Sequence, residues 1–125
     1  MNSDLKNLRK FHGHIGPYVV LGYIMGIYVK GYLESIDRIV AHVNHRPPVS
    51  CLLDGLQLST GCTLGKNKIK IVPVKWFRRV DFFKKNKKIS VTFKSILKEK
   101  LKSTTKSALS YINHSAKEHL FNLNK

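Results

Sequence analysis

The sequence of 125 residues is poor in cysteine, in acidic side chains and in long apolar runs. Two cysteines without a secretory context do not make a disulfide framework, so reduced thiols are expected. The N-terminus lacks the basic and then apolar pattern of a signal peptide, which predicts a cytoplasmic protein. The longest apolar stretch, residues 17–29, falls short of the roughly 20 residues that span a bilayer, so no membrane span is expected.

Acidic residues are scarce enough to give the chain a formal net charge of +16. The imbalance lies in the second half: residues 1–65 hold six basic and four acidic side chains, whereas residues 66–125 hold seventeen and three. Such an excess attracts nucleic acid, anionic membranes or acidic proteins. The alternative is a generic basic surface without a dedicated partner, and the composition alone leaves both interpretations open.

The length fits one domain, or one domain with a tail. Apolar periodicity predicts helices over 4–10, 17–33, 51–60, 95–102 and 107–123, and strands over 37–45, 68–77, 80–83 and 89–93. We therefore expect an α+β domain with N-terminal helices, a small and mostly antiparallel sheet, and C-terminal helices. The expected division is a core over 1–95 and a basic helical C-terminal extension over 96–125, packed on that core. Gly22 and Gly26 share one helix face, where they permit close packing in the core or in a dimer.

Two short clusters concentrate the residues that could bind a transition metal. His12 and His14 stand in the first cluster, at residues 11–17, and both cysteines stand in the second, at residues 51–66. If the fold brings the clusters together, the mixed nitrogen and sulfur site suits zinc or another divalent first-row transition metal. Spacing alone equally allows buried, inert thiols and ordinary polar histidines, because Cys51 and Cys62 would lie at opposite ends of one short helix.

A family resemblance adds to this interpretation. The segment FHGHIGP at residues 11–17, followed by an apolar, glycine-bearing helix, resembles the opening of the FmdE family, which is associated with formylmethanofuran dehydrogenase. The segments CLLDGLQ at 51–57 and STGCTLGKN at 59–67 are similar to the second block of that family. The resemblance covers roughly residues 5–95 and implies an α+β core, a homodimer and a metal-binding pocket built from both blocks.

Carried over residue by residue, the resemblance implies a ligand set and its surroundings. His14, Cys51 and Cys62 are the implied metal ligands, and His12 is either a fourth ligand or a residue that orients one. Asp54 would accept a hydrogen bond from a ligand histidine, act as a catalytic acid or base, or merely cap a helix. The implied pocket residues are Gln57, Thr63 and Lys66, with Lys66 either neutralising an anionic ligand or simply solvated.

The sequence departs from the family pattern in two places. The family usually has cysteine immediately before the proline, whereas this chain has Gly16, which either leaves an open coordination position or abolishes the site. Longer relatives carry a cysteine-rich C-terminal zinc finger, and this chain has no cysteine after Cys62.

Three functions follow from these features. The first is a small metal-binding protein, with metal-assisted chemistry on a small molecule or a one-carbon carrier or with no catalysis. The second is a non-catalytic dimeric subunit that docks on a larger redox enzyme. The third is a basic protein that makes weak polyanion or nucleic-acid contacts. The residues expected to carry these contacts are Trp76, Arg78, Arg79, Lys84, Lys85, Lys87 and Lys88, with Phe77, Phe82 and Phe83 beside them.

Overall fold

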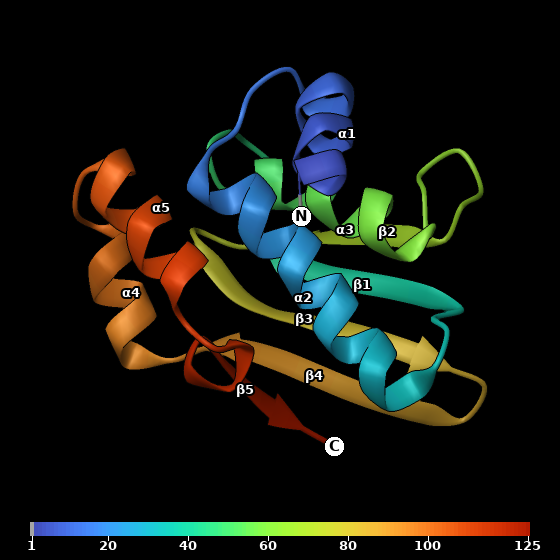
Figure 1. The fold of residues 1–125 in the computed structure, drawn as a ribbon. Coiled ribbons are helices and arrows are strands. Elements are labelled where there is room, and N and C mark those ends of the chain that lie inside the picture. The colour runs from blue at the N-terminus through green and yellow to red at the C-terminus, as the bar shows by residue number, and fades with distance from the viewer. Residues whose placement is uncertain (1) are drawn as a thin grey trace.

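The computed structural model describes residues 2–125, which form helices and strands in mixed order (Figure 1). The first half contains α1 (Asn2–His12), α2 (Pro17–Leu33), β1 (Arg38–Val43), α3 (Cys51–Thr60) and β2 (Ile69–Pro73). The second half contains β3 (Phe77–Lys84), β4 (Lys87–Phe93), α4 (Ser95–Leu101), α5 (Thr105–His114), the 3-10 turn η1 (Lys117–His119) and β5 (Phe121–Asn124). No helix within this range is long and apolar enough to cross a bilayer.

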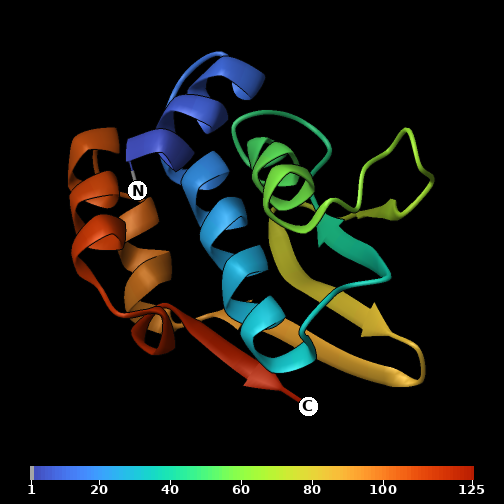
Figure 2. The same cartoon turned by 45° about the vertical axis from the view of Figure 1, so that its right-hand side comes forward.

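The five strands form one sheet in the order β2-β1-β3-β4-β5. Only the β1–β2 pair is parallel, and the other three pairs are antiparallel. Figures 1 and 2 show α2 and α3 lying across one face of this sheet, with α4 and α5 grouped near the β5 side. The predicted α+β class, the predicted β3–β4 hairpin and the mostly antiparallel sheet are confirmed.

Close packing of α2 against α3 fixes the helix layer. A Cβ atom at Gly22 would collide with the backbone carbonyl of Leu52, and one at Gly26 would collide with the side chain of Ser59. On the opposite helix, Gly55 approaches the backbone of α2 in the same way. The two glycines of α2 therefore serve packing within the chain, and their face is not available to a second copy.

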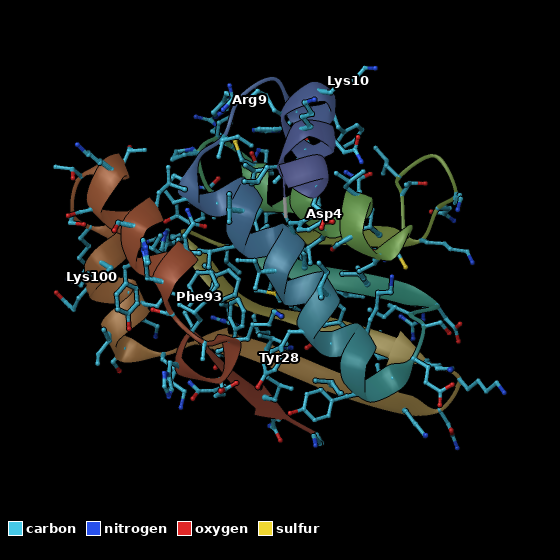
Figure 3. The ribbon with its side chains drawn as sticks, viewed as in Figure 1. Asp4, Arg9, Lys10, Tyr28, Phe93 and Lys100 are labelled. Atoms are coloured by element: carbon cyan, nitrogen blue, oxygen red, sulfur yellow. The ribbon has the colours of Figure 1, made fainter. Side chains whose placement is uncertain are left out.

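The core lies between the helix layer and the sheet. Strand residues at alternating positions point into it, such as Ile39, Val80 and Phe82, each at most 1% exposed. In Figure 3, Phe93 lies in this interior, whereas Lys10 and Lys100 lie on the outside of the molecule. Stacking of Phe93 on Phe77, with ring centroids 3.8 Å apart, extends the core towards α5.

The C-terminal segment corrects the predicted helix over 107–123. Helix α5 ends at His114, the backbone of Ser115 is extended, and residues 121–124 add a fifth strand alongside β4. The alternation of Phe121 and Leu123 with asparagines is a period-two pattern, which in this segment outweighs the helical spacing of Ile112 and Leu120. The expected 96–125 extension thus contributes helices and a strand.

Candidate metal centre

The two histidines of the first cluster lie on the turn between α1 and α2. His12 is the last residue of α1, and Gly13 follows with a φ of +106°, a left-handed conformation that glycine adopts readily. Pro17 then begins α2, where its missing N–H costs no hydrogen bond. This tight reversal places the rings of His12 and His14 beside each other, with centroids 4.6 Å apart.

A short hydrogen bond ties this turn to α3. The Nδ1 atom of His12 lies 2.6 Å from a carboxylate oxygen of Asp54, and the other oxygen of Asp54 accepts from the amide of Gln57 at 3.3 Å. Gln57 is itself held, because its side-chain oxygen accepts from the backbone N–H of Leu64 at 2.9 Å. The chain His12–Asp54–Gln57 fixes the orientation of the His12 ring and leaves its Nε2 atom facing away from the carboxylate.

The Nε2 atom of His12 is buried and has no hydrogen-bond partner among the described residues. The His12 side chain is only 10% exposed, so water does not readily satisfy this atom. With Nδ1 donating to Asp54, Nε2 carries a free lone pair, which is the form that binds metals. Such a nitrogen is costly to bury unless something binds it.

Three residues from the two clusters lie close together. Single ligand atoms of His12, His14 and Cys51 all lie within 4.8 Å of one another. Around a tetrahedral zinc ion, nitrogen and sulfur ligand atoms lie about 3.4–3.8 Å apart, so a contraction of about 1 Å would complete the geometry. The donor set and the orphaned nitrogen both fit a late first-row metal.

The surroundings of Cys51 favour the protonated thiol. Burial first, and the neighbouring Asp54 carboxylate second, raise the pKa of the Cys51 thiol above its usual value. Binding of a metal at this sulfur would therefore release a proton.

Of the four predicted ligands, Cys62 lies away from the other three. Cys51 begins α3 and Cys62 follows its end, so a helix of about 15 Å separates them. The Cys62 thiol is buried and donates a hydrogen bond to the backbone carbonyl of Ile36 at 3.3 Å. Burial, the largest effect, raises the pKa of this thiol, although a hydrogen bond with Thr60 opposes it.

The remaining predicted pocket residues separate into two groups. Gln57 and Asp54 line an open groove of about 820 Å³ beside the cluster, which His12 and Cys51 also line. Thr63 and Lys66 belong instead to the loop after α3, where the Thr63 side chain accepts from the Lys66 backbone and the Lys66 ammonium donates to the Gly61 carbonyl. The structure therefore brings Gln57, but not Thr63 or Lys66, to the cluster.

Sequence reasoning did not assign four further residues to the lining of the groove. The residues concerned are His45, Leu53, Leu64 and Ile71. Alternation along β2 predicts that Ile71 faces the core, yet it is 37% exposed because β2 is an edge strand whose inner face extends past α3. That alternation could not distinguish a core position from a groove wall.

Gly16 lies directly beside the cluster. A Cβ atom at this position would lie 3.5 Å from the Nε2 atom of His14, in ordinary van der Waals contact, and the φ of −135° suits any residue. A side chain at Gly16 would therefore enter the space next to the His14 ring, and glycine leaves that space free.

Comparison with known proteins agrees with the resemblance of the sequence to the FmdE family. Residues 11–122 match the family model described as FmdE, molybdenum formylmethanofuran dehydrogenase operon. A protein of Archaeoglobus fulgidus, named as a probable S-adenosyl-L-methionine-binding protein, is 37% identical over 70 residues, which cover 52% of this chain and 19% of that protein. The matched region thus spans about a fifth of this relative's length.

Proposed function

We propose that this chain, which belongs to the FmdE family, binds one divalent first-row transition metal, zinc in the first instance, through His12, His14 and Cys51. The single observation that carries the proposal is the buried, unpartnered Nε2 atom of His12, whose ring Asp54 holds beside His14 and Cys51. A carboxylate that holds the second nitrogen of a ligand histidine is a recurrent feature of metal sites. We place this protein in the cytosol as part of the same proposal.

Three protein ligands would leave a fourth coordination position for water or a small molecule. A metal bound there would supply Lewis acidity or an activated water molecule. The protein's own residues position the reactants. Asp54 holds the His12 ring and Gln57 holds Asp54, while the groove walls orient a small molecule. Both carboxylate oxygens of Asp54 are engaged, which favours a positioning role over acid or base catalysis.

The groove supports chemistry on a small molecule or a one-carbon carrier, because apolar and polar walls meet beside the cluster. Its apolar side includes Leu53 and Ile71, and its polar side includes His45 and Gln57. S-adenosyl-L-methionine, named for the A. fulgidus relative, is the first molecule to test by calorimetry. If S-adenosyl-L-methionine does not bind, it is excluded as the small molecule of the groove, and the metal proposal is unaffected.

Elemental analysis of untagged protein, loaded with zinc under reducing conditions and desalted, tests the metal proposal. We expect about one zinc per chain in the wild type and none in His14→Ala. His114→Ala is the matched control, because His114 lies on α5 and contacts the Ser110 carbonyl. Equal zinc content in the two variants, or none in the wild type, would refute the proposed site.

A second role, as a dimeric subunit docking on a larger redox enzyme, is favoured by the free edge of β2. Ile71 and Val72 are both 37% exposed on this edge strand, and exposed apolar edges promote association. The operon named in the family description suggests the dehydrogenase as a partner. Light scattering of the wild type and of Val72→Lys tests whether the chain forms a dimer through this edge. Co-purification with the dehydrogenase tests the larger complex. If the wild type is a monomer and does not co-purify with the dehydrogenase, this role is excluded.

A further inference from the structure

The sheet has a second face that no helix within residues 2–125 covers. In Figures 1 and 2 the helices gather on one side of the strands and at the β5 side, away from this face. Register and alternation place the following residues of β1 to β4 on the second face: Arg38, Val40, His42, Lys70, Val72, Arg79, Asp81, Phe83, Lys88, Ser90 and Thr92. They alternate along the strands with core residues such as Ile39 and Phe82, and we call this surface the basic face.

Positive charge dominates the basic face. Arg38, Lys70, Arg79 and Lys88 are permanent cations, and they come from four adjacent strands. The one acid, Asp81, is 3% exposed and already paired, since it accepts from Arg79 at 3.1 Å, lies 3.1 Å from His42 and accepts from Ser90 at 2.6 Å. The carboxylate therefore fixes Arg79 in place and offers nothing to an incoming cation.

An aromatic ring lies in the middle of these cations. Phe83 is half-buried, with the guanidinium of Arg38 3.8 Å from its ring centroid and the ammonium of Lys88 5.9 Å away. The other aromatics expected beside the basic residues face inward: Phe77 and Phe82 are buried, and Trp76 donates to the Tyr18 hydroxyl at 2.8 Å. Phe83 is thus the phenyl ring on this face; the planar side chains of Arg38, Arg79 and His42 lie there too, and Asp81 holds the last two.

The cations and the Phe83 ring together favour one kind of binding partner for the basic face over another. A second copy would bring the same four cations against each other, which is unfavourable. An anionic partner gains from the three cations without an acidic partner on this face, Arg38, Lys70 and Lys88, and can also reach Arg79 beside Asp81. Flat groups amid cations suit bases that stack and phosphates that pair, as in proteins that bind single strands on a sheet.

We propose that the basic face binds single-stranded nucleic acid, with Arg38, Lys70, Arg79 and Lys88 contacting phosphates and Phe83 stacking on a base. Lys84, Lys85 and Lys87 on the adjoining β3–β4 hairpin extend the positive potential at one end of the face. His12 and Cys51 lie with the helix layer, away from the basic face, whereas Arg38 and Lys70 also line the groove beside the cluster. RNA affinity and zinc content are separate measurements, so either proposal can fail without the other.

Fluorescence anisotropy with a labelled single-stranded RNA of about 20 nucleotides tests the proposal at several salt concentrations. The triple variant Arg38→Gln, Lys70→Gln, Lys88→Gln should bind at least about 30-fold more weakly and reduce the salt slope by about 2. Phe83→Leu keeps the charge and should weaken binding by about fivefold or more. Thermal melts of each variant confirm that the fold is intact.

The matched control removes the same charge elsewhere, through Lys98→Gln, Lys106→Gln and Lys117→Gln on exposed positions of the C-terminal segment. It should change the affinity by less than about threefold. Equal losses in the two triple variants would show that net charge alone attracts RNA. An unaffected Phe83→Leu, or binding of phosphatidylserine vesicles in place of RNA, would also overturn the proposal.

Discussion

Two histidine–aspartate pairs lie on opposite sides of this molecule, and they differ in what each carboxylate leaves free. Asp54 holds one nitrogen of His12 and leaves the other buried and unpartnered beside His14 and Cys51. Asp81 is instead surrounded, since His42, Arg79 and Ser90 all converge on it. The first pair presents a ligand atom, whereas the second neutralises a buried charge. The same two residue types thus serve binding in one place and structure in the other.

The largest expected difference between the two pairs is the effect of replacing each histidine on zinc affinity. His12→Ala should reduce zinc affinity by more than about 100-fold, because it removes the oriented ligand. His42→Ala should leave zinc affinity unchanged, since His42 lies on the other side of the sheet. Competition with a fluorescent zinc chelator measures both variants, and a zinc loss in His42→Ala would contradict the assignment.

Asp54→Asn should have the next largest effect. The amide keeps the volume but loses the charge that orients and strengthens His12, so zinc affinity should fall about 10-fold to 100-fold. The same chelator competition measures it. Asp37→Asn is the control, because Asp37 accepts only from the exposed Lys85 backbone at 2.7 Å. An unchanged affinity in Asp54→Asn would mean that the hydrogen bond does not support a ligand.

Asp81→Asn should act on stability and leave zinc binding intact. Losing a buried carboxylate with three partners should lower the free energy of unfolding by about 1–3 kcal/mol. Urea denaturation at pH 7 measures this loss. Glu99→Gln is the control, because its exposed pair with Lys102 at 3.6 Å contributes only about 0–1 kcal/mol. Equal stabilities for the two variants would show that the Asp81 network is not structural.

The Asp81 network also predicts a pH dependence. Burial alone would raise the pKa of Asp81, but the hydrogen bonds from Ser90 and His42 and the charge of Arg79 outweigh it and hold that pKa below its usual value. A depressed pKa contributes stability above the unfolded value of about 3.9, and this stability is lost as the pH falls through the folded pKa. Urea midpoints should therefore fall more steeply below about pH 4 in the wild type than in Asp81→Asn. Parallel pH profiles would contradict this.

Gly16→Cys should tighten zinc binding, and this is the smallest of the expected changes in zinc affinity. The new side chain would begin 3.5 Å from the Nε2 atom of His14, so its thiolate can supply a fourth ligand. We expect zinc to bind about tenfold more tightly. Gly65→Cys, in open space on the loop after α3, adds an equivalent thiol away from the cluster. Tighter binding in both variants would show only that an added cysteine scavenges zinc.

The fold was largely predictable because its strongest signals are local. Pro17 at the start of α2, the alternation along β1 and the lysine-rich β3–β4 turn each act within a few residues. The exception was β5, where an alternation of only four residues competed with a longer helical spacing. Strand pairing with β4 decides that competition, and pairing is not visible in a local pattern.

The candidate site was predictable as a set of residue types but not as an arrangement. The resemblance pointed to His12, His14 and Cys51, which the fold brings together. It also pointed to Cys62, and only the length of α3 separates that cysteine from the others. A hydrogen bond from a histidine was one of three roles predicted for Asp54, and the choice among them needed the α1–α3 contact, which spans 42 residues of sequence.

Cobalt(II) titration of the wild type, Cys51→Ser and Cys62→Ser tests the central claim most directly, because thiolate-to-cobalt absorption reports which sulfur binds. The wild type and Cys62→Ser should each take up one equivalent and show this absorption, whereas Cys51→Ser should not. Loss of the absorption in Cys62→Ser with retention in Cys51→Ser, or no cobalt uptake by the wild type, would contradict the proposed centre.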